Sequence, residues 1–208
     1  DKGRAGAVKA GEIMKGAGVN FDEVHTSKLN RAIETAQLAQ KGMSAQWVPL
    51  QKFWRLNERC YGDLEGKKRE DVAKEVGDDQ VKIWRRSFDV PPPSLAVTDA
   101  RSPVKDPRYA DLDPRVIPAS ESLKDVIARV GPYWTDQLRP AIKSGKTVLV
   151  VGHSTNLRAL SAWIEPNLDE KALQKLEIKN TKPILYEFDK NMNVICRKVL
   201  EPSTVKKE

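Results

Sequence analysis

Residues 147–151 are the segment that most limits how this chain can fold. They contain four aliphatic residues in a row, which is typical of a strand buried on both faces of a parallel sheet. Gly152 and His153 follow at once, and a helical pattern begins near residue 156. Open α/β sheets bind their ligands beyond the carboxyl ends of the strands. His153 and Arg158 are therefore expected at the ligand-binding edge of such a sheet.

Strand patterns and helical patterns alternate along most of the chain. This alternation predicts the α/β class, as a three-layer α/β/α sandwich with a mostly parallel sheet. We expect a single domain over residues 1–208, with an irregular insertion at 91–119 over the site, because that stretch is rich in proline and charge. Ser27 and Ser120 are expected to cap two of the helices. The predicted helices cover residues 4–17, 27–38, 69–76, 79–86, 120–138 and 156–164, and the other predicted strands cover 21–26, 46–50, 183–188 and 194–200.

Composition excludes several classes of protein. Hydrophobic residues make up 39% and charged residues 31% of the chain, as in soluble globular proteins. No apolar run approaches the roughly 18 residues of a membrane span. The net charge of +7 comes from scattered basic residues without a nucleic-acid-binding motif, so it indicates an anion pocket or a generally basic surface. Cys60 and Cys196 lack metal-ligand spacing, which favours reduced cysteines in a cytoplasmic protein with no metal.

Glu58 is a candidate for proton transfer, because it lies in a loop between Arg55 and Arg59. A carboxyl group can donate and accept protons near neutral pH if burial raises its pKa, although neighbouring arginines oppose that shift. The alternative is a surface ion pair. Arg31 lies early in a helix that follows a strand, so its head is able to reach the same edge as His153. The alternatives here are a solvated arginine and a buried histidine with satisfied hydrogen bonds.

Arg85 and Arg86 form an adjacent pair near a predicted helix end. The planar guanidinium group matches phosphate and carboxylate in its geometry. Adjacent helical side chains point about 100° apart, so both arginines engage one ligand only near a helix end or across a wide anion. The alternative is a solvated basic pair.

The sequence resembles a known family in several segments. These are LNERCYG at 56–62, QVKIWRRSFD at 80–89, RYADL at 108–112 and ESLKD at 121–125. They closely resemble the cofactor-dependent phosphoglycerate mutases of the histidine phosphatase superfamily, and the resemblance spans nearly the whole chain. It implies an isomerase of glycolysis and gluconeogenesis that interconverts 3-phosphoglycerate and 2-phosphoglycerate through a phosphohistidine. It also implies 2,3-bisphosphoglycerate as primer, a small phosphorylated metabolite as substrate, no metal, no nucleic acid or membrane partner, and a homodimer or homotetramer.

The resemblance also assigns roles to residues. Glu58 is the expected general acid and base, and His153 is expected to stabilise the phosphoryl group during its transfer. The residues expected to bind substrate are Arg31, Arg59, Cys60, Tyr61, Arg69, Arg85, Arg86, Ser154 and Thr155.

Departures from the family pattern leave alternatives open. The nucleophilic histidine of the family lies in an Arg-His-Gly motif on a central strand, which is expected upstream of Asp1. Ser154 and Thr155 stand where glycine and asparagine are usual, Arg69 replaces a lysine, and Cys60 stands where histidine is common. The alternatives are a phosphohydrolase of the same superfamily, a bisphosphoglycerate mutase, and a catalytically degenerate homologue.

Overall fold

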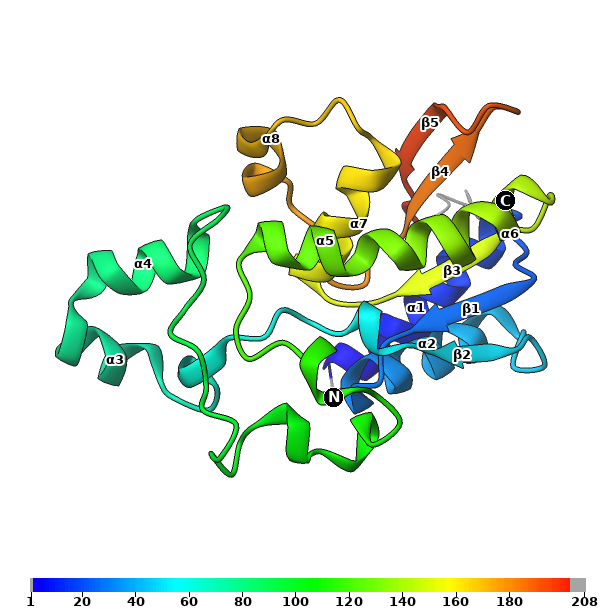
Figure 1. Ribbon diagram of the computed structural model, residues 1–208. Helices are drawn as coiled ribbons and strands as arrows, with labels where there is room; N and C mark the ends of the chain where they lie inside the picture. The colour runs from blue at the N-terminus through cyan, green and yellow to red at the C-terminus, as the bar shows by residue number, and fades with distance from the viewer. Residues whose placement is uncertain (1, 203–208) are drawn as a thin grey trace.

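A short parallel sheet lies at the centre of the computed structural model, which describes residues 2–202 (Figure 1). Its strand order is β2-β1-β3. Thr26 at the end of β1 lies opposite Val151 at the end of β3, so both strands stop at the same level of the sheet. The strands are β1 (Glu23–Thr26), β2 (Leu50–Lys52) and β3 (Val148–Val151).

Helices cover both faces of this sheet, which confirms the predicted three-layer α/β fold. Leu149 and Val151 of β3 pack into a core with α1 and α2, whereas Val148 and Val150 pack against α5 and α7. β3 therefore packs on both faces as predicted, although its four side chains are only partly buried among the described residues. The four helices are α1 (Lys2–Gly16), α2 (Asn30–Met43), α5 (Leu123–Tyr133) and α7 (Ser154–Ile164).

The predicted long helix after residue 120 is present but divided. Ser122, not Ser120, caps α5, and it forms a capping box with Asp125. Ser120 instead donates its hydroxyl to the carbonyl of Pro92 at 2.6 Å. The helix continues through a π-helical turn (Trp134–Leu138) into α6 (Arg139–Lys143). This wider turn keeps both Trp134 and Leu138 in the core.

Residues 53–119 form the part of the molecule that reaches away from the sheet (Figure 1). They contain α3 (Arg69–Val76) and α4 (Asp78–Arg86), in agreement with the sequence. The expected irregular excursion at 91–119 has only short 3-10 turns, as does the preceding loop. These turns are Trp54–Leu56, Gly62–Leu64, Pro103–Lys105, Pro107–Tyr109 and Pro114–Val116.

The C-terminal part adds α8 (Glu170–Lys175), which the sequence did not predict, and the predicted hairpin of β4 (Ile184–Phe188) and β5 (Val194–Val199). Within the described residues, β3 pairs only with β1, and β4 pairs only with β5. A cavity of about 930 Å³ lies between β3 and β4, and residues of both strands contribute to its mixed apolar and polar lining. One strand edge on each side of this cavity has no hydrogen-bonded neighbour in the part described.

Two boundaries expected from the sequence are wrong. Residues 46–48 form a turn, and the strand predicted there lies at Leu50–Lys52 instead, because only that stretch reaches β1. The helix expected to begin under a Ser27 cap begins at Asn30, with Leu29 at its N-cap and no side-chain cap. The Ser27 hydroxyl instead contacts His153 and the backbone N–H of Leu29. No helix within residues 2–202 is both long and apolar enough to cross a membrane.

Candidate active site

The carboxyl ends of β1 and β3 bring Ser27 and His153 together. His153 follows β3 and occupies the N-cap position of α7, and Ser27 follows β1. The Oγ atom of Ser27 lies 2.9 Å from Nε2 of His153, although the residues are 126 positions apart in the sequence. Both side chains are buried. The sheet edge predicted to hold His153 is therefore built by two neighbouring parallel strands.

Arg31 completes this contact from the first turn of α2. Its Nε donates a hydrogen bond to Nδ1 of His153 at 3.2 Å. Burial, together with the positive charges of Arg31 and Arg129, lowers the pKa of His153 from 6.5 to about 4. The imidazole is thus neutral near pH 7 in the ligand-free site.

Glu58 approaches the same edge from the loop after β2. Its Oε1 accepts the backbone N–H of Arg59 at 2.8 Å, and its Oε2 lies 3.5 Å from the backbone nitrogen of Thr155. Thr155 is in the first turn of α7, where backbone N–H groups have no helical partner and favour anions. A carboxylate and an anion-binding helix end therefore face each other across a short gap.

A cavity of about 600 Å³ joins these groups. It is lined by the predicted residues Arg31, Glu58, His153 and Ser154, and by the N-terminal part of α1. The structure thus gathers four of the predicted site residues in one hollow at the sheet edge. An arginine, a neutral imidazole, a carboxylate and free backbone N–H groups can together bind an oxyanion and move a proton beside it.

A buried ion pair shapes the loop that carries Glu58. Arg129 of α5 donates to both carboxylate oxygens of Glu121, at 2.6 and 2.9 Å. It also donates to the carbonyl of Arg55 at 2.8 Å and to that of Asn57 at 3.2 Å. Glu121 in turn accepts the backbone N–H of Cys60 at 2.9 Å. We call this contact network the Arg129 clamp, because it holds the loop on both sides of Glu58.

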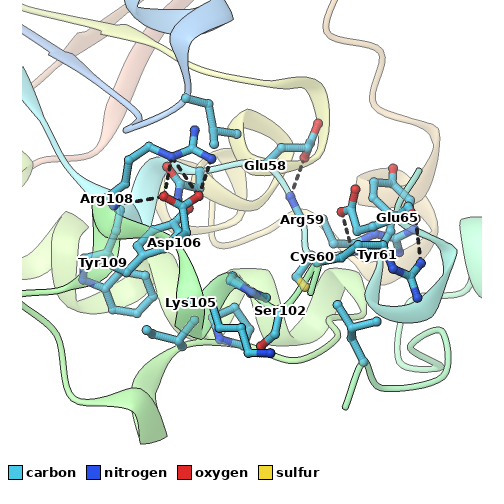
Figure 2. Close-up of a pocket in the computed structure, with 18 of the residues that line it drawn as sticks. Glu58, Arg59, Cys60, Tyr61, Glu65, Ser102, Lys105, Asp106, Arg108 and Tyr109 are labelled. Atoms are coloured by element: carbon cyan, nitrogen blue, oxygen red, sulfur yellow. Dashed lines mark hydrogen bonds and ion pairs between the residues drawn. The ribbon is translucent and has the colours of Figure 1, made fainter. Parts of the chain in front are cut away.

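A second cavity of about 760 Å³ adjoins the first, because Arg31 and Glu58 line both (Figure 2). Figure 2 shows the segment from Glu58 to Tyr61 on one side and residues of the 91–119 excursion on the other. In the excursion, Arg108 pairs with Asp106, so its charge is largely balanced within the wall. Residues of the excursion therefore line one side of this second cavity.

Tyr61 links the loop to the arginine pair. The guanidinium of Arg59 lies 4.5 Å from the centre of the Tyr61 ring, and that of Arg85 lies 5.4 Å from it. Arg59 is buried and donates to the carbonyl of Trp84 at 3.2 Å, so it caps the end of α4 as well. Its Nε is buried without a partner among the described residues.

Arg86 and Arg158 approach each other from α4 and α7. Burial and then the charge of Arg86 lower the pKa of Arg158, whereas the charge of Glu58 acts in the opposite direction. The Nε of Arg158 donates to the carbonyl of Leu176 at 3.0 Å, which fixes the side chain. Two like charges held close together indicate a place suited to an anion.

Several predicted binding residues lie outside the two cavities around Glu58, and one has an unreactive side chain. Arg69 begins α3, is exposed, and lies 3.6 Å from Asp78 in an ion pair. Arg69 lines neither of the two cavities around Glu58, and neither do Thr155, Arg85 and Arg86. Cys60 lines the second cavity, but burial raises its pKa to about 11, so its thiol stays protonated.

Sequence reasoning missed several residues of the site. Ser27 was expected only as a helix cap, and neither Arg129 nor Glu121 lies in a pattern that indicates a buried clamp. Arg158 was expected at the sheet edge but without a role. Its position five residues after His153, early in α7, was the available signal. Within residues 2–202, no three His, Cys, Asp or Glu side chains are grouped so that they could hold a metal ion.

Comparison with known proteins agrees with this geometry. The model of the histidine phosphatase superfamily (branch 1) matches residues 1–106 and 98–199. The chain therefore belongs to the histidine phosphatase superfamily. Within it, a protein of Streptococcus thermophilus named 2,3-bisphosphoglycerate-dependent phosphoglycerate mutase is 46% identical over 195 residues, 94% of this chain and 84% of the relative. A protein of the same name from Streptococcus pneumoniae is 45% identical over the same shares.

Solved structures share the fold. Bacillus stearothermophilus YhfR superimposes with a TM-score of 0.66 and 22% identity, over 93% of this chain and 80% of that one. A phosphoglycerate mutase from Bacillus anthracis gives a TM-score of 0.58 and 24% identity, over 88% and 73%. These similarities bear on the architecture alone.

Proposed function

We propose that this protein is a 2,3-bisphosphoglycerate-dependent phosphoglycerate mutase, which interconverts 3-phosphoglycerate and 2-phosphoglycerate. The observation that carries the proposal is the shared cavity of Arg31, Glu58 and His153 at the carboxyl ends of parallel strands. The relatives that carry this enzyme name cover 94% of the chain, which supports the same reading.

The residues divide the work of binding and proton transfer. Arg31, His153 and the first N–H groups of α7 bind the phosphoryl group, where charge spreads over three oxygens. Glu58 moves the proton of the glycerate hydroxyl, because its carboxylate faces that helix end.

The remaining arginines suit the rest of the substrate. Arg85, Arg86 and Arg158 offer guanidinium groups for the substrate carboxylate, since two of them already lie close enough to repel each other. These cationic side chains also suit 2,3-bisphosphoglycerate, which supplies the phosphoryl group when it is bound.

The nucleophilic histidine is part of the proposal. We place it on a strand upstream of Asp1, between β3 and β4. The facing edges of these strands, which have no paired neighbour among the described residues, and the cavity between them support this position. A chain that starts at Asp1 is expected to lack mutase turnover and to gain both turnover and thermal stability when the preceding residues are added. Equal stability of the two chains would argue against a strand in this cavity.

One assay separates the mutase from its alternatives. The full-length protein receives 3-phosphoglycerate and a trace of 2,3-bisphosphoglycerate, and both 2-phosphoglycerate and free phosphate are measured. Formation of 2-phosphoglycerate supports the mutase. In a parallel reaction that supplies 1,3-bisphosphoglycerate as phosphoryl donor, formation of 2,3-bisphosphoglycerate indicates a bisphosphoglycerate mutase. Phosphate release without isomerisation indicates a phosphohydrolase. No turnover in the presence of phosphate binding indicates a degenerate homologue, which the Ser154 and Thr155 departures favour slightly.

We also propose that the protein is a homodimer and that it acts in the cytoplasm. The outer edge of β2 has no strand partner in the described part, and Trp47 beside it is 81% exposed. A large exposed aromatic residue next to an open strand edge supports an interface between two copies. Cys60 and Cys196 are free thiols, which suits a reducing compartment.

A further inference from the structure

Ser27 is fully buried, which a role as a helix cap does not require. Its side chain has no exposed surface. The Oγ atom accepts the backbone N–H of Leu29 at 3.1 Å and lies 2.9 Å from Nε2 of His153. The hydroxyl thus joins the chain turn after β1 to the imidazole at the end of β3.

The hydrogen bond from Arg31 fixes which imidazole nitrogen carries the proton. A guanidinium has only donors, so Nδ1 of His153 must accept the bond from Nε of Arg31. The ring is neutral near pH 7 and has a single N–H, which therefore lies on Nε2. This N–H donates to the Oγ of Ser27, whose second lone pair takes the N–H of Leu29.

The two ring nitrogens face different surroundings. Nε2 points at the fully buried Ser27, whereas Nδ1 points at Arg31, which is exposed and lines the cavity. We propose that Ser27 is a positioning residue: by accepting the Nε2–H bond it fixes the tautomer of His153 and leaves Nδ1 to meet an anion. This inference rests on the proposed function, which supplies a phosphoryl group as that anion.

Anion binding then changes the state of the ring in a defined way. The anion accepts the hydrogen bond of the Arg31 guanidinium, so Nδ1 of His153 no longer accepts a hydrogen bond from Arg31. One proton from solvent adds to that lone pair, and the resulting imidazolium donates from Nδ1 to the anion while Nε2–H stays on Ser27. Burial, Arg31 and Arg129 all oppose a positive charge on His153, so the anion itself must stabilise the imidazolium.

Nitrogen-15 NMR of the full-length protein tests the proposal directly. His153 is assigned by the loss of its signals in His153→Gln. We expect the Nε2–H tautomer near pH 7 without ligand, and protonation of Nδ1 as well after addition of inorganic phosphate. His25 is an internal reference, because its Nε2 also faces an acceptor, Glu23, at 3.0 Å, away from this site. A ligand-free spectrum with the proton on Nδ1 of His153 would overturn the proposal without any variant.

Ser27→Ala gives the functional readout. We expect it to shift the Nε2 signal of His153 and to lower kcat roughly tenfold, because one buried hydrogen bond is lost, while KM for 3-phosphoglycerate stays nearly constant. Ser161→Ala is the matched control, since it removes another buried serine hydroxyl, on α7, that contacts only the helix backbone and Tyr186. Unchanged kcat and unchanged His153 signals in Ser27→Ala contradict the role.

Two further results distinguish the positioning role of Ser27 from a packing role and from the proposed mutase function. Ser27→Thr retains a hydroxyl and is expected to restore the tautomer and much of the kcat, which a purely packing role for Ser27 does not predict. If the protein binds phosphate with the expected spectra but does not isomerise 3-phosphoglycerate, the proposed function fails and the role of Ser27 stands. If the protein isomerises 3-phosphoglycerate but His153 has the opposite tautomer, the proposed function stands and the role of Ser27 fails.

Discussion

Glu58 has a position that suits proton transfer more than ion pairing. It accepts a hydrogen bond from the backbone N–H of Arg59 and faces that of Thr155, with no ion pair to a described side chain within 4.0 Å. The sequence indicated Glu58 through its place between two arginines. It gave no indication that the arginine side chains turn to other partners, because those partners come from α4 and from the main chain.

Glu58→Gln tests the proton-transfer role. The amide keeps the shape of the side chain but cannot take up a proton, so we expect kcat to fall by about two orders of magnitude or more. Steady-state mutase kinetics measure the effect. Glu70→Gln, at an exposed position of α3, is the matched control and should leave kcat unchanged. A kcat within a factor of about two of the wild type would exclude Glu58 as the general acid and base.

Arg86 tests the binding of the substrate carboxylate or phosphate. We expect Arg86→Ala to raise KM strongly, by roughly ten- to a hundred-fold, because a charge-assisted contact is lost. Arg86→Lys should recover only part of it, since an ammonium group lacks the planar fork. The exposed Arg115, which pairs with Asp113 away from the cavities, is the control for loss of a surface arginine. An unchanged KM in Arg86→Ala would remove this residue from the site.

His153 also affects stability as a function of pH. In the fold its pKa falls from 6.5 to about 4, so between these values the unfolded chain binds a proton that the folded chain excludes. Stability is therefore lost as the pH falls through this window. We expect the free energy of unfolding, measured by urea denaturation, to decrease between about pH 6.5 and 5, by at most about 1.4 kcal/mol per pH unit for this residue. His153→Gln should give a shallower slope, and an equal slope would contradict the assignment.

Among individual residues, the sequence predicted the position of His153 but not the contact that Ser27 makes with it. His153 was predictable, because a buried strand followed by glycine and a polar residue indicates the ligand edge of an α/β sheet. Ser27 was assigned to a cap because serine after a strand usually plays that part. Its contact with His153 depends on two distant strands ending at the same level, which no local pattern contains.

At the scale of elements, the loop carrying Glu58 has little structure of its own. It contains two short 3-10 turns, and its shape depends on the Arg129 clamp from α5. Helices and strands with clear periodicity were predicted well, including β3, α3 and the hairpin. The strand at 46–50 was misplaced, because three residues of apolar character do not fix a register without the neighbouring strand.

Removing the clamp should be costly. Arg129→Met leaves the buried carboxylate of Glu121 and several carbonyls without a donor, so we expect unfolding to become easier by about 3–5 kcal/mol. Urea denaturation of Arg129→Met, Glu121→Gln and the double variant measures the coupling between the two residues. Lys182→Met, which breaks an exposed pair with Glu201, is the control and should cost less than about 1 kcal/mol. Additive effects of the two buried substitutions would refute the clamp.

At the scale of the whole molecule, two hydrophobic cores lie on opposite faces of one small sheet. The alternation of helices and strands was enough to predict this architecture. The sequence could not place the 53–119 region, because its position depends on side-chain contacts to α5 and α7 and not on hydrophobic periodicity. It also could not show that β2 forms an outer edge of the sheet.

The outer edge of β2 leads to a prediction about the oligomeric state. Trp47→Glu puts a charge on the exposed apolar surface beside β2, so we expect it to shift the proposed dimer towards monomer in analytical ultracentrifugation. Ile195→Glu, which replaces another strongly exposed apolar side chain on β5, should leave the sedimentation coefficient unchanged. Identical behaviour of both variants would rule out the β2 edge as the interface.

The Arg129 clamp has a consequence for synthesis on the ribosome. The loop around Glu58 leaves the exit tunnel more than 70 residues before the guanidinium that shapes it, as the separations of 72 and 74 positions show. His153 emerges later still. The nascent chain therefore carries its proton-transferring carboxylate on an unshaped loop for several seconds at ordinary elongation rates. During that interval the segment is open to proteases and chaperones, and the site can bind an anion only after His153 has emerged.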